Sequence, residues 1–146
     1  MASFTTQQAA GRGPIRGPGW SSQEVSAYAE YTLTACATAD FWDMLWVPNG
    51  AIITGITLFS EDVDSNGTPT VAFSVGDASS STRFISSSTV GQAGGFTSTL
   101  ATGTGAMFFK YTADTKIRVT ATTGSATFAA GKIKLKVSYL IEPMLS

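Results

Sequence analysis

The sequence predicts an all-β protein: a two-sheet antiparallel β-sandwich, jelly-roll-like or Greek-key, with an extended N-terminal arm. Ser and Thr make up 38 of the 146 residues and charged residues only 13%, which suits strands and turns better than solvated helices. Apolar and polar residues alternate through several segments, and Gly-, Pro- or Asn-containing runs separate them. The length fits one domain, which we place at 23–146, after an arm at 1–22.

The predicted arm contains a run, residues 11–19, with four Gly, two Pro and two Arg. Such a run cannot hold a helix, and Pro removes the donors that a central strand needs. We expect a flexible, extended segment that orders against a partner, the alternative being a terminus without a role. The partner-binding residues of the arm would be Arg12, Pro14, Ile15, Arg16 and Trp20. The first seven residues lack the pattern of a signal peptide, so we expect synthesis in a cytoplasm.

The first strands are expected in the acidic half of the chain. Period-two alternation over 25–36 predicts a half-buried strand. The apolar segment 41–47 ends at the turn signature Pro48-Asn49-Gly50. Residues 51–59 follow as a strand with Ile52, Thr54, Ile56 and Leu58 opposing Ile53, Gly55, Thr57 and Phe59. Because both of these faces are largely apolar, we expect this strand at the centre of a sheet.

The remaining strands are expected at 70–75, 83–85, 107–111, 116–121 and 132–141. A turn at 62–67 precedes them, and the polar, Gly-rich connection 86–105 interrupts them as a functional loop, a crossing between sheets or a contact surface. The last strand alternates cleanly. Its lysines, Lys132, Lys134 and Lys136, point outward, where they protect an edge or an exposed sheet from wrong pairing.

Opposite charges occupy opposite halves of the chain. Residues 24–77 contain eight acids and no Lys or Arg, whereas 83–136 contain seven bases and one acid. Either the two halves pair and the charges meet across the sheets, or oppositely charged faces guide contact between subunits. The bases are too sparse for a nucleic-acid partner, and no apolar run reaches the ~18 residues of a membrane span.

The composition argues against an enzyme. The chain has no His and a single Cys, Cys36, which removes His-assisted nucleophiles, the commonest zinc ligands and disulfides. We therefore predict no catalytic residue and no cofactor. We expect Cys36 to be an inert filler on the polar face of the first strand.

One spacing resembles the first half of a calcium loop. Asp62, Asp64 and Asn66 supply oxygen at alternate positions, with Gly67 sixth. The twelfth position, where a bidentate Glu is required, is Phe73. An Asn-Gly turn between two strands explains the same residues without metal. We therefore predict a turn, with calcium as the alternative.

The tryptophans raise a second binding hypothesis. Trp20, Trp42 and Trp46 could line a sugar platform, and Trp42 and Trp46 point the same way if they lie in one regular strand. In a sandwich of this size such residues are more often core or interface anchors.

Three stretches resemble a known kind of virion protein. Residues 47–58 read VPNGAIITGITL, residues 68–77 read TPTVAFSVGD, and residues 82–85 read TRFI. With the closing strand 132–141, they resemble small tailed-bacteriophage structural proteins encoded near the major capsid protein, which commonly act as head decoration or cement proteins. The resemblance covers roughly residues 47–141.

The resemblance implies a homotrimer on the outer capsid surface of the virion, at local threefold or twofold axes, that binds the major capsid protein and bridges capsomers. The arm would then be a tether laid over a capsid protein or a neighbouring copy. The resemblance implies no catalytic residues. A tail- or fibre-associated virion protein and a carbohydrate-binding β-sandwich module stay open as alternatives.

Overall fold

A computed structural model describes residues 24–98, 100–102 and 105–141 of the chain. The predicted arm contacts Arg12, Pro14, Ile15, Arg16 and Trp20 lie outside the described residues. The regular structure of the described part consists of eight strands and one turn of 3-10 helix, η1. Their bounds are β1 Glu24–Thr32, β2 Phe41–Val47, β3 Ala51–Ser60, β4 Ala72–Gly76, β5 Ile85–Ser88, η1 Val90–Gln92, β6 Gly95–Thr97, β7 Thr115–Thr123 and β8 Lys132–Ile141.

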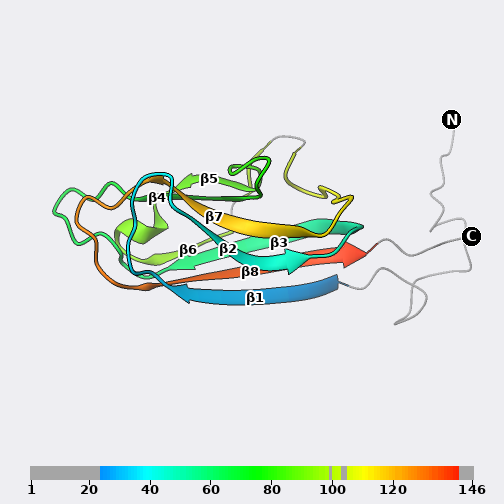
Figure 1. Cartoon of the computed structure of the whole chain (residues 1–146), viewed down its shortest axis with the longest axis horizontal. Coiled ribbons are helices and arrows are strands. Elements are labelled where there is room, and N and C mark those ends of the chain that lie inside the picture. The colour runs from blue at the N-terminus through cyan, green and yellow to red at the C-terminus, as the bar shows by residue number, and fades with distance from the viewer. Residues whose placement is uncertain (1–23, 99, 103–104, 142–146) are drawn as a thin grey trace, which may run out of the picture.

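The strands form two antiparallel four-stranded sheets, β1-β8-β3-β6 and β2-β7-β4-β5 (Figure 1). Four of the strand pairs are those that one long hairpin would form: β1 with β8, β2 with β7, β3 with β6 and β4 with β5. Rolling that hairpin up places alternate pairs in opposite sheets, which is the arrangement of a jelly roll. The predicted all-β sandwich is confirmed, and its strand order is the jelly-roll one.

The core lies between the sheets and is built by period-two alternation. In β7, Ile117, Val119 and Ala121 are buried as predicted. In β8, Ile133, Leu135 and Val137 are buried, whereas the three lysines of the strand point away from the core. Since β8 lies between β1 and β3, those lysines cover an exposed sheet face, not an edge.

Two bulges overturn side-chain directions that strict alternation predicts. In β3 the register shifts between Ile53 and Gly55, so Ile53 lies buried on the same side as Ile56 and Leu58 instead of opposing them. In β2 the register shifts between Asp43 and Leu45. The extra residue of a bulge reverses which sheet face each following side chain occupies. The sequence pattern of one strand cannot locate a bulge, because the bulge is defined by pairing with a neighbouring strand.

Other predicted elements change in extent. The first strand ends at Thr32, and Cys36 lies beyond it, buried in the core rather than on a polar strand face. Burial raises the pKa of the Cys36 thiol. The connection 86–105 contains β6, which joins β3 while β5 joins β4. Of the three interpretations of this connection, the crossing between sheets is therefore confirmed.

Residues 107–111 do not form the predicted regular strand. The amide of Phe109 donates to the carbonyl of Ala106 across a tight turn. Phe108 has a φ of 60°, a left-handed conformation that a bulky side chain rarely adopts. Tyr111 resumes antiparallel pairing with Ala51.

Charges from the two halves of the chain meet. Arg83 pairs with Asp77 at 2.7 Å and Arg118 with Asp43 at 2.9 Å, and Lys132 lies 3.6 Å from Glu30. Each pair joins an acid of the first half to a base of the second. Asp43–Arg118 and Glu30–Lys132 lie on paired strands, as the first interpretation predicts, whereas Asp77 and Arg83 are six residues apart and meet beside one turn.

Candidate interaction surface

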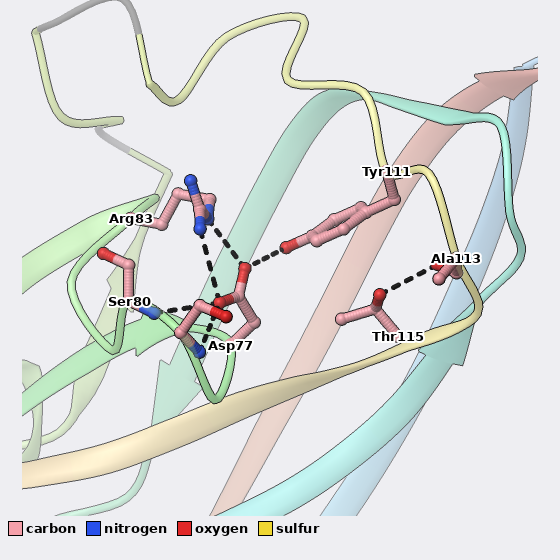
Figure 2. A network of polar contacts seen from close by, with 7 residues as sticks. Asp77, Ser80, Arg83, Tyr111, Ala113 and Thr115 are labelled. Atoms are coloured by element: carbon pink, nitrogen blue, oxygen red, sulfur yellow. Dashed lines mark hydrogen bonds and ion pairs between the residues drawn. The ribbon is translucent and has the colours of Figure 1, made fainter.

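A buried carboxylate organises one end of the sandwich. Asp77 follows β4, and its side chain is only 3% exposed. It accepts hydrogen bonds from Arg83 Nε at 2.7 Å, from the Tyr111 hydroxyl at 2.6 Å and from the amides of Ser79 and Ser80 at 2.9 Å each (Figure 2). The network ties the turn after β4 to the segment that leads into β7.

The pKa values of Asp77 and Tyr111 are shifted in the directions that keep this hydrogen bond formed at neutral pH. Burial raises the pKa of Asp77, but the donors Arg83, Tyr111 and Ser80 outweigh it and lower that pKa. Burial and the bond to Asp77 raise the pKa of Tyr111. At neutral pH the carboxylate is therefore ionised and the phenol remains a donor.

The segment 106–111, which contains Tyr111, is also held by aromatic packing and by hydrogen bonds to β3. The Arg83 guanidinium lies 4.0 Å from the centre of the Phe109 ring, which meets the Tyr111 ring edge-on at 4.9 Å. Along β3, the amide of Ile53 donates to the Phe109 carbonyl at 2.9 Å, and the amide of Phe108 donates to the Ile53 carbonyl at 2.8 Å. Ala106 is buried at the start of the segment.

The residues between these anchors point outward. Met107 and Phe108 are exposed, Phe108 to 66%, and together we call them the apolar tip. A left-handed Phe persists only where the surrounding structure over-determines it, and such strain gathers at functional sites. An aromatic side chain presented on a fixed backbone is the kind of anchor that protein interfaces use. We therefore treat the apolar tip as the candidate site.

Strand β1 begins at the same end of the domain as the apolar tip. Strands β1 and β3 run in the same direction because both are antiparallel to β8. Glu24, the first residue of β1, and Ile52 of β3 flank the same residue of β8, Leu140. Phe108 bonds to Ile53, next to Ile52.

A second group of exposed aromatic side chains lies on the outer face of β2. Trp46 is 61% exposed with Lys116 above its ring, and Phe41 lies under the Arg118 guanidinium at 3.8 Å. Trp42 instead turns inward and meets the core residue Phe73 edge-on. Because the β2 bulge separates them, Trp42 and Trp46 do not share a face, and the described residues do not bring them together as a sugar platform.

The calcium candidates lie in the loop between β3 and β4. The Asp64 carboxylate is buried and accepts the amides of Asn66, Thr70, Val71, Ala126 and Thr127. Asp62 and Asn66 accept the amides of Asp64 and Thr68. The described residues contain no cluster of three or more His, Cys, Asp or Glu that could hold a metal. The loop therefore shows the hydrogen bonding of a turn.

Asp64 is almost completely buried, with 1% of its surface exposed. Burial raises the pKa of Asp64, but the amides of Thr127, Ala126, Thr70 and Val71 lower it further than burial raises it. The carboxylate stays ionised and its oxygens are occupied by backbone donors. Its arrangement is that of a loop organiser rather than of an acid or base.

Sequence reasoning missed the apolar tip. The signal available was the run Met107-Phe108-Phe109, which does not alternate and follows a Gly-rich stretch. We assigned that run to a strand because apolar residues favour strands. Of the three side chains only that of Phe109 is partly buried against the core, and the bonds that fix this arrangement come from Asp77 and Ile53, which are distant in sequence.

No protein-family model matches the chain, and no curated protein matches it. Among solved structures, it is similar to a chain of the cyanophage Pam1 capsid asymmetric unit, with 33% identity and a TM-score of 0.76, covering 93% of this chain and 97% of that chain. It is also similar to a chain of the capsid of Ralstonia phage GP4, with 26% identity and a TM-score of 0.70, covering 94% and 95% of the two chains.

The chain is also similar to a chain of the acidic stable capsid structure of Helicobacter pylori bacteriophage KHP30. The identity is 17% and the TM-score 0.55, and the match covers 82% of this chain and 92% of that chain. At that identity it supports the fold alone. No helix in the described part of the chain is long and apolar enough to cross a membrane.

Proposed function

Since this chain belongs to the family of bacteriophage capsid components that includes the matched chain of the cyanophage Pam1 capsid, we propose that it is a decoration, or cement, protein of a phage head. It binds the outer surface of the capsid through the major capsid protein and bridges neighbouring capsomers. Copies associate as homotrimers at local symmetry axes. The full-length likeness to a capsid component of similar size carries this proposal.

The surface of the domain favours decoration over building the shell itself. A shell subunit needs large, continuous contacts with every neighbour, whereas the contact features identified on the described residues are the apolar tip and the exposed aromatic side chains of β2. Small interfaces are individually weak, but many copies on a repetitive surface combine them into stable attachment.

The apolar tip and the arm can act together. Because β1 begins at the end that carries Phe108, both can engage the same capsid surface at one time. The tip supplies an aromatic anchor that costs little ordering on binding, since its backbone is already held. The arm, with Arg12, Arg16 and Trp20, adds a second attachment and raises the effective concentration of the first.

The test is co-sedimentation of the purified protein with mature heads that lack it. We expect saturable binding of the full-length protein, weaker binding after deletion of residues 1–20, and at least about tenfold weaker binding of Phe108→Ala, as for an aromatic hot spot. The control is Phe96→Ala. Phe96 is 72% exposed but lies in β6, paired with the far end of β3, and should bind like the parent.

Three results would count against parts of this proposal. Absence of binding by the full-length protein would overturn decoration and favour attachment to tails or fibres, to be tested with purified tails. Quenching of tryptophan fluorescence by sugars would instead support a carbohydrate-binding module. Equal losses from Phe96→Ala and Phe108→Ala would remove the apolar tip from the interface while leaving decoration standing.

A further inference from the structure

The described strands leave four sheet edges, and three of these edges carry features that discourage pairing. Strand β6 has three residues and β5 has four, with an irregular register against β4. Strand β2 is interrupted by its bulge. Short strands and bulges are the devices by which natural proteins protect sheet edges from other chains.

The fourth edge, β1, has none of these features. It is nine residues long and pairs with β8 without a register shift. Among the described residues no strand pairs with its other side, and it runs along the border of the molecule in Figure 1. Every second amide and carbonyl of β1 therefore points away from its sheet without a backbone partner in the described part of the chain.

The core-facing side of β1 is incompletely covered as well. Val25 and Tyr31 lie opposite Tyr139 and Ile133 of β8, yet they remain 41% and 45% exposed. The residues between them on this side, Ala27 and Ala29, are small. This side carries no charge, so it lacks the inward-pointing charge that would reject an added strand.

We propose that β1 is a pairing edge for a second copy of this chain, joined antiparallel to the β1 of that copy about a twofold axis. Full overlap of two Glu24–Thr32 strands puts the axis at Tyr28, the middle residue. The two four-stranded sheets then continue into one eight-stranded sheet, and the exposed amides and carbonyls of both edges are paired.

The strand is complementary to itself in this register. On the core side Val25 meets Tyr31 of the second copy and Ala27 meets Ala29, so small residues are opposed at the centre and larger ones at the ends. On the outer side Glu30 meets Ser26, and Glu24 meets Thr32. No like charges are opposed, and directly opposed like charges are what would destabilise such a pair.

This contact goes beyond the proposed function and does not depend on it. An isologous pairing joins copies two at a time, so it is a contact additional to the homotrimer. On a capsid it would link copies that belong to neighbouring trimers. It therefore offers a route by which a decoration layer could connect capsomers without contacting every shell subunit.

Cysteine cross-linking of the purified full-length protein, without heads, tests the proposal. Tyr28→Cys places two thiols beside the axis, with α-carbons about 4.5–5.5 Å apart, within reach of a disulfide. We expect a covalent dimer under mild oxidation on non-reducing electrophoresis. Lys136→Cys is the matched control, because Lys136 lies next to Tyr28 but one strand inward, roughly 14 Å from its counterpart. Native Cys36 is buried and serves as the unmodified background.

Two further variants separate edge pairing from random collision. Ala29→Lys, added to Tyr28→Cys, puts a charge on the core side of the interface and should reduce cross-linking at least about tenfold. Ser26→Lys, on the outer side and opposite Glu30, should leave it unchanged or increase it. Circular dichroism checks that each variant folds.

A Tyr28→Cys variant that stays monomeric would overturn the proposal, as would equal cross-linking of Lys136→Cys or indifference to Ala29→Lys. In the first case the edge would be left for a strand of a different protein. Because heads are absent from the assay, such a failure is distinct from a failure of capsid binding.

Discussion

Two buried aspartates do most of the loop organisation in this domain. Asp64 joins the loop before β4 to residues 126 and 127, and Asp77 joins the turn after β4 to Tyr111. The sequence predicts a turn at Asp64, with calcium as the alternative, and the bonds from the nearby amides of Asn66, Thr70 and Val71 agree with the turn. The other two donors, the amides of residues 126 and 127, lie some sixty residues away, and residue spacing carries no information about them.

Removing one donor from Asp77 should cost stability. We expect Tyr111→Phe to lower the free energy of unfolding by about 1.5–3 kcal/mol, the usual contribution of a hydrogen bond to a charged group, as measured by urea unfolding. Tyr28→Phe, measured on dilute, monomeric protein, is the control. It removes a hydroxyl that also donates to a carboxylate, that of Glu30, but at a site 60% exposed, so it should change the free energy of unfolding by no more than about 0.5 kcal/mol. Equal effects of the two variants would contradict a structural role for the Asp77 network.

At the scale of the element, alternation identified most strands because one side of each faces the core. The final strand, 132–141, matches its predicted bounds, and β7 buries the three predicted side chains. Some failures concern extent: the first strand ends at Thr32, and the strand predicted at 83–85 is β5, Ile85–Ser88. The others involve departures from regular geometry, which are the bulges in β2 and β3 and the left-handed Phe108 between β6 and β7. Each depends on a partner strand or distant anchor, so the apolar tip could not be predicted from local pattern.

The junction of β4 with its following turn has no room for a side chain. A Cβ at Gly76 would collide with the carbonyl oxygen of Ser80 and lie 2.7 Å from the carbonyl carbon of Ser81. Those are backbone atoms, and Ser80 also accepts the Asp77 amide. We expect Gly76→Ala to destabilise the domain by at least about 1–3 kcal/mol, measured by thermal unfolding.

The control for that substitution is Gly55→Ala in β3, where a Cβ would meet nothing within 4 Å. It should be neutral or slightly stabilising, because alanine restricts the unfolded chain. If both variants lose the same stability, a general intolerance of strands to the change would explain the result better than the crowding at Gly76.

For the molecule as a whole, the lowered pKa values of Asp64 and Asp77 make stability depend on pH. In acid the unfolded chain takes up protons on these groups before the folded domain does. Their contribution is therefore complete above about pH 5, and it is lost as pH falls below about 4 towards the folded pKa values. We expect urea midpoints to be flat from pH 7 to 5 and to drop steeply below pH 4.

Replacing Asp64 with Asn provides the control for this pH dependence. Asp64→Asn should lower the midpoint at pH 7 and flatten the acid limb, since one of the two buried carboxylates with a lowered pKa is gone. An unchanged acid limb in the variant would show that other carboxylates set the acid sensitivity.

The rolled-hairpin topology also sets the order in which the described strands can dock during synthesis. Among these strands β1 is synthesised first and β8 last, and β1 has no other partner than β8. A nascent chain therefore cannot pair β1 within its sheet until β8 has been synthesised. Pairing over so long a sequence separation is slow, so we expect the docking of β1 to be a late step of folding.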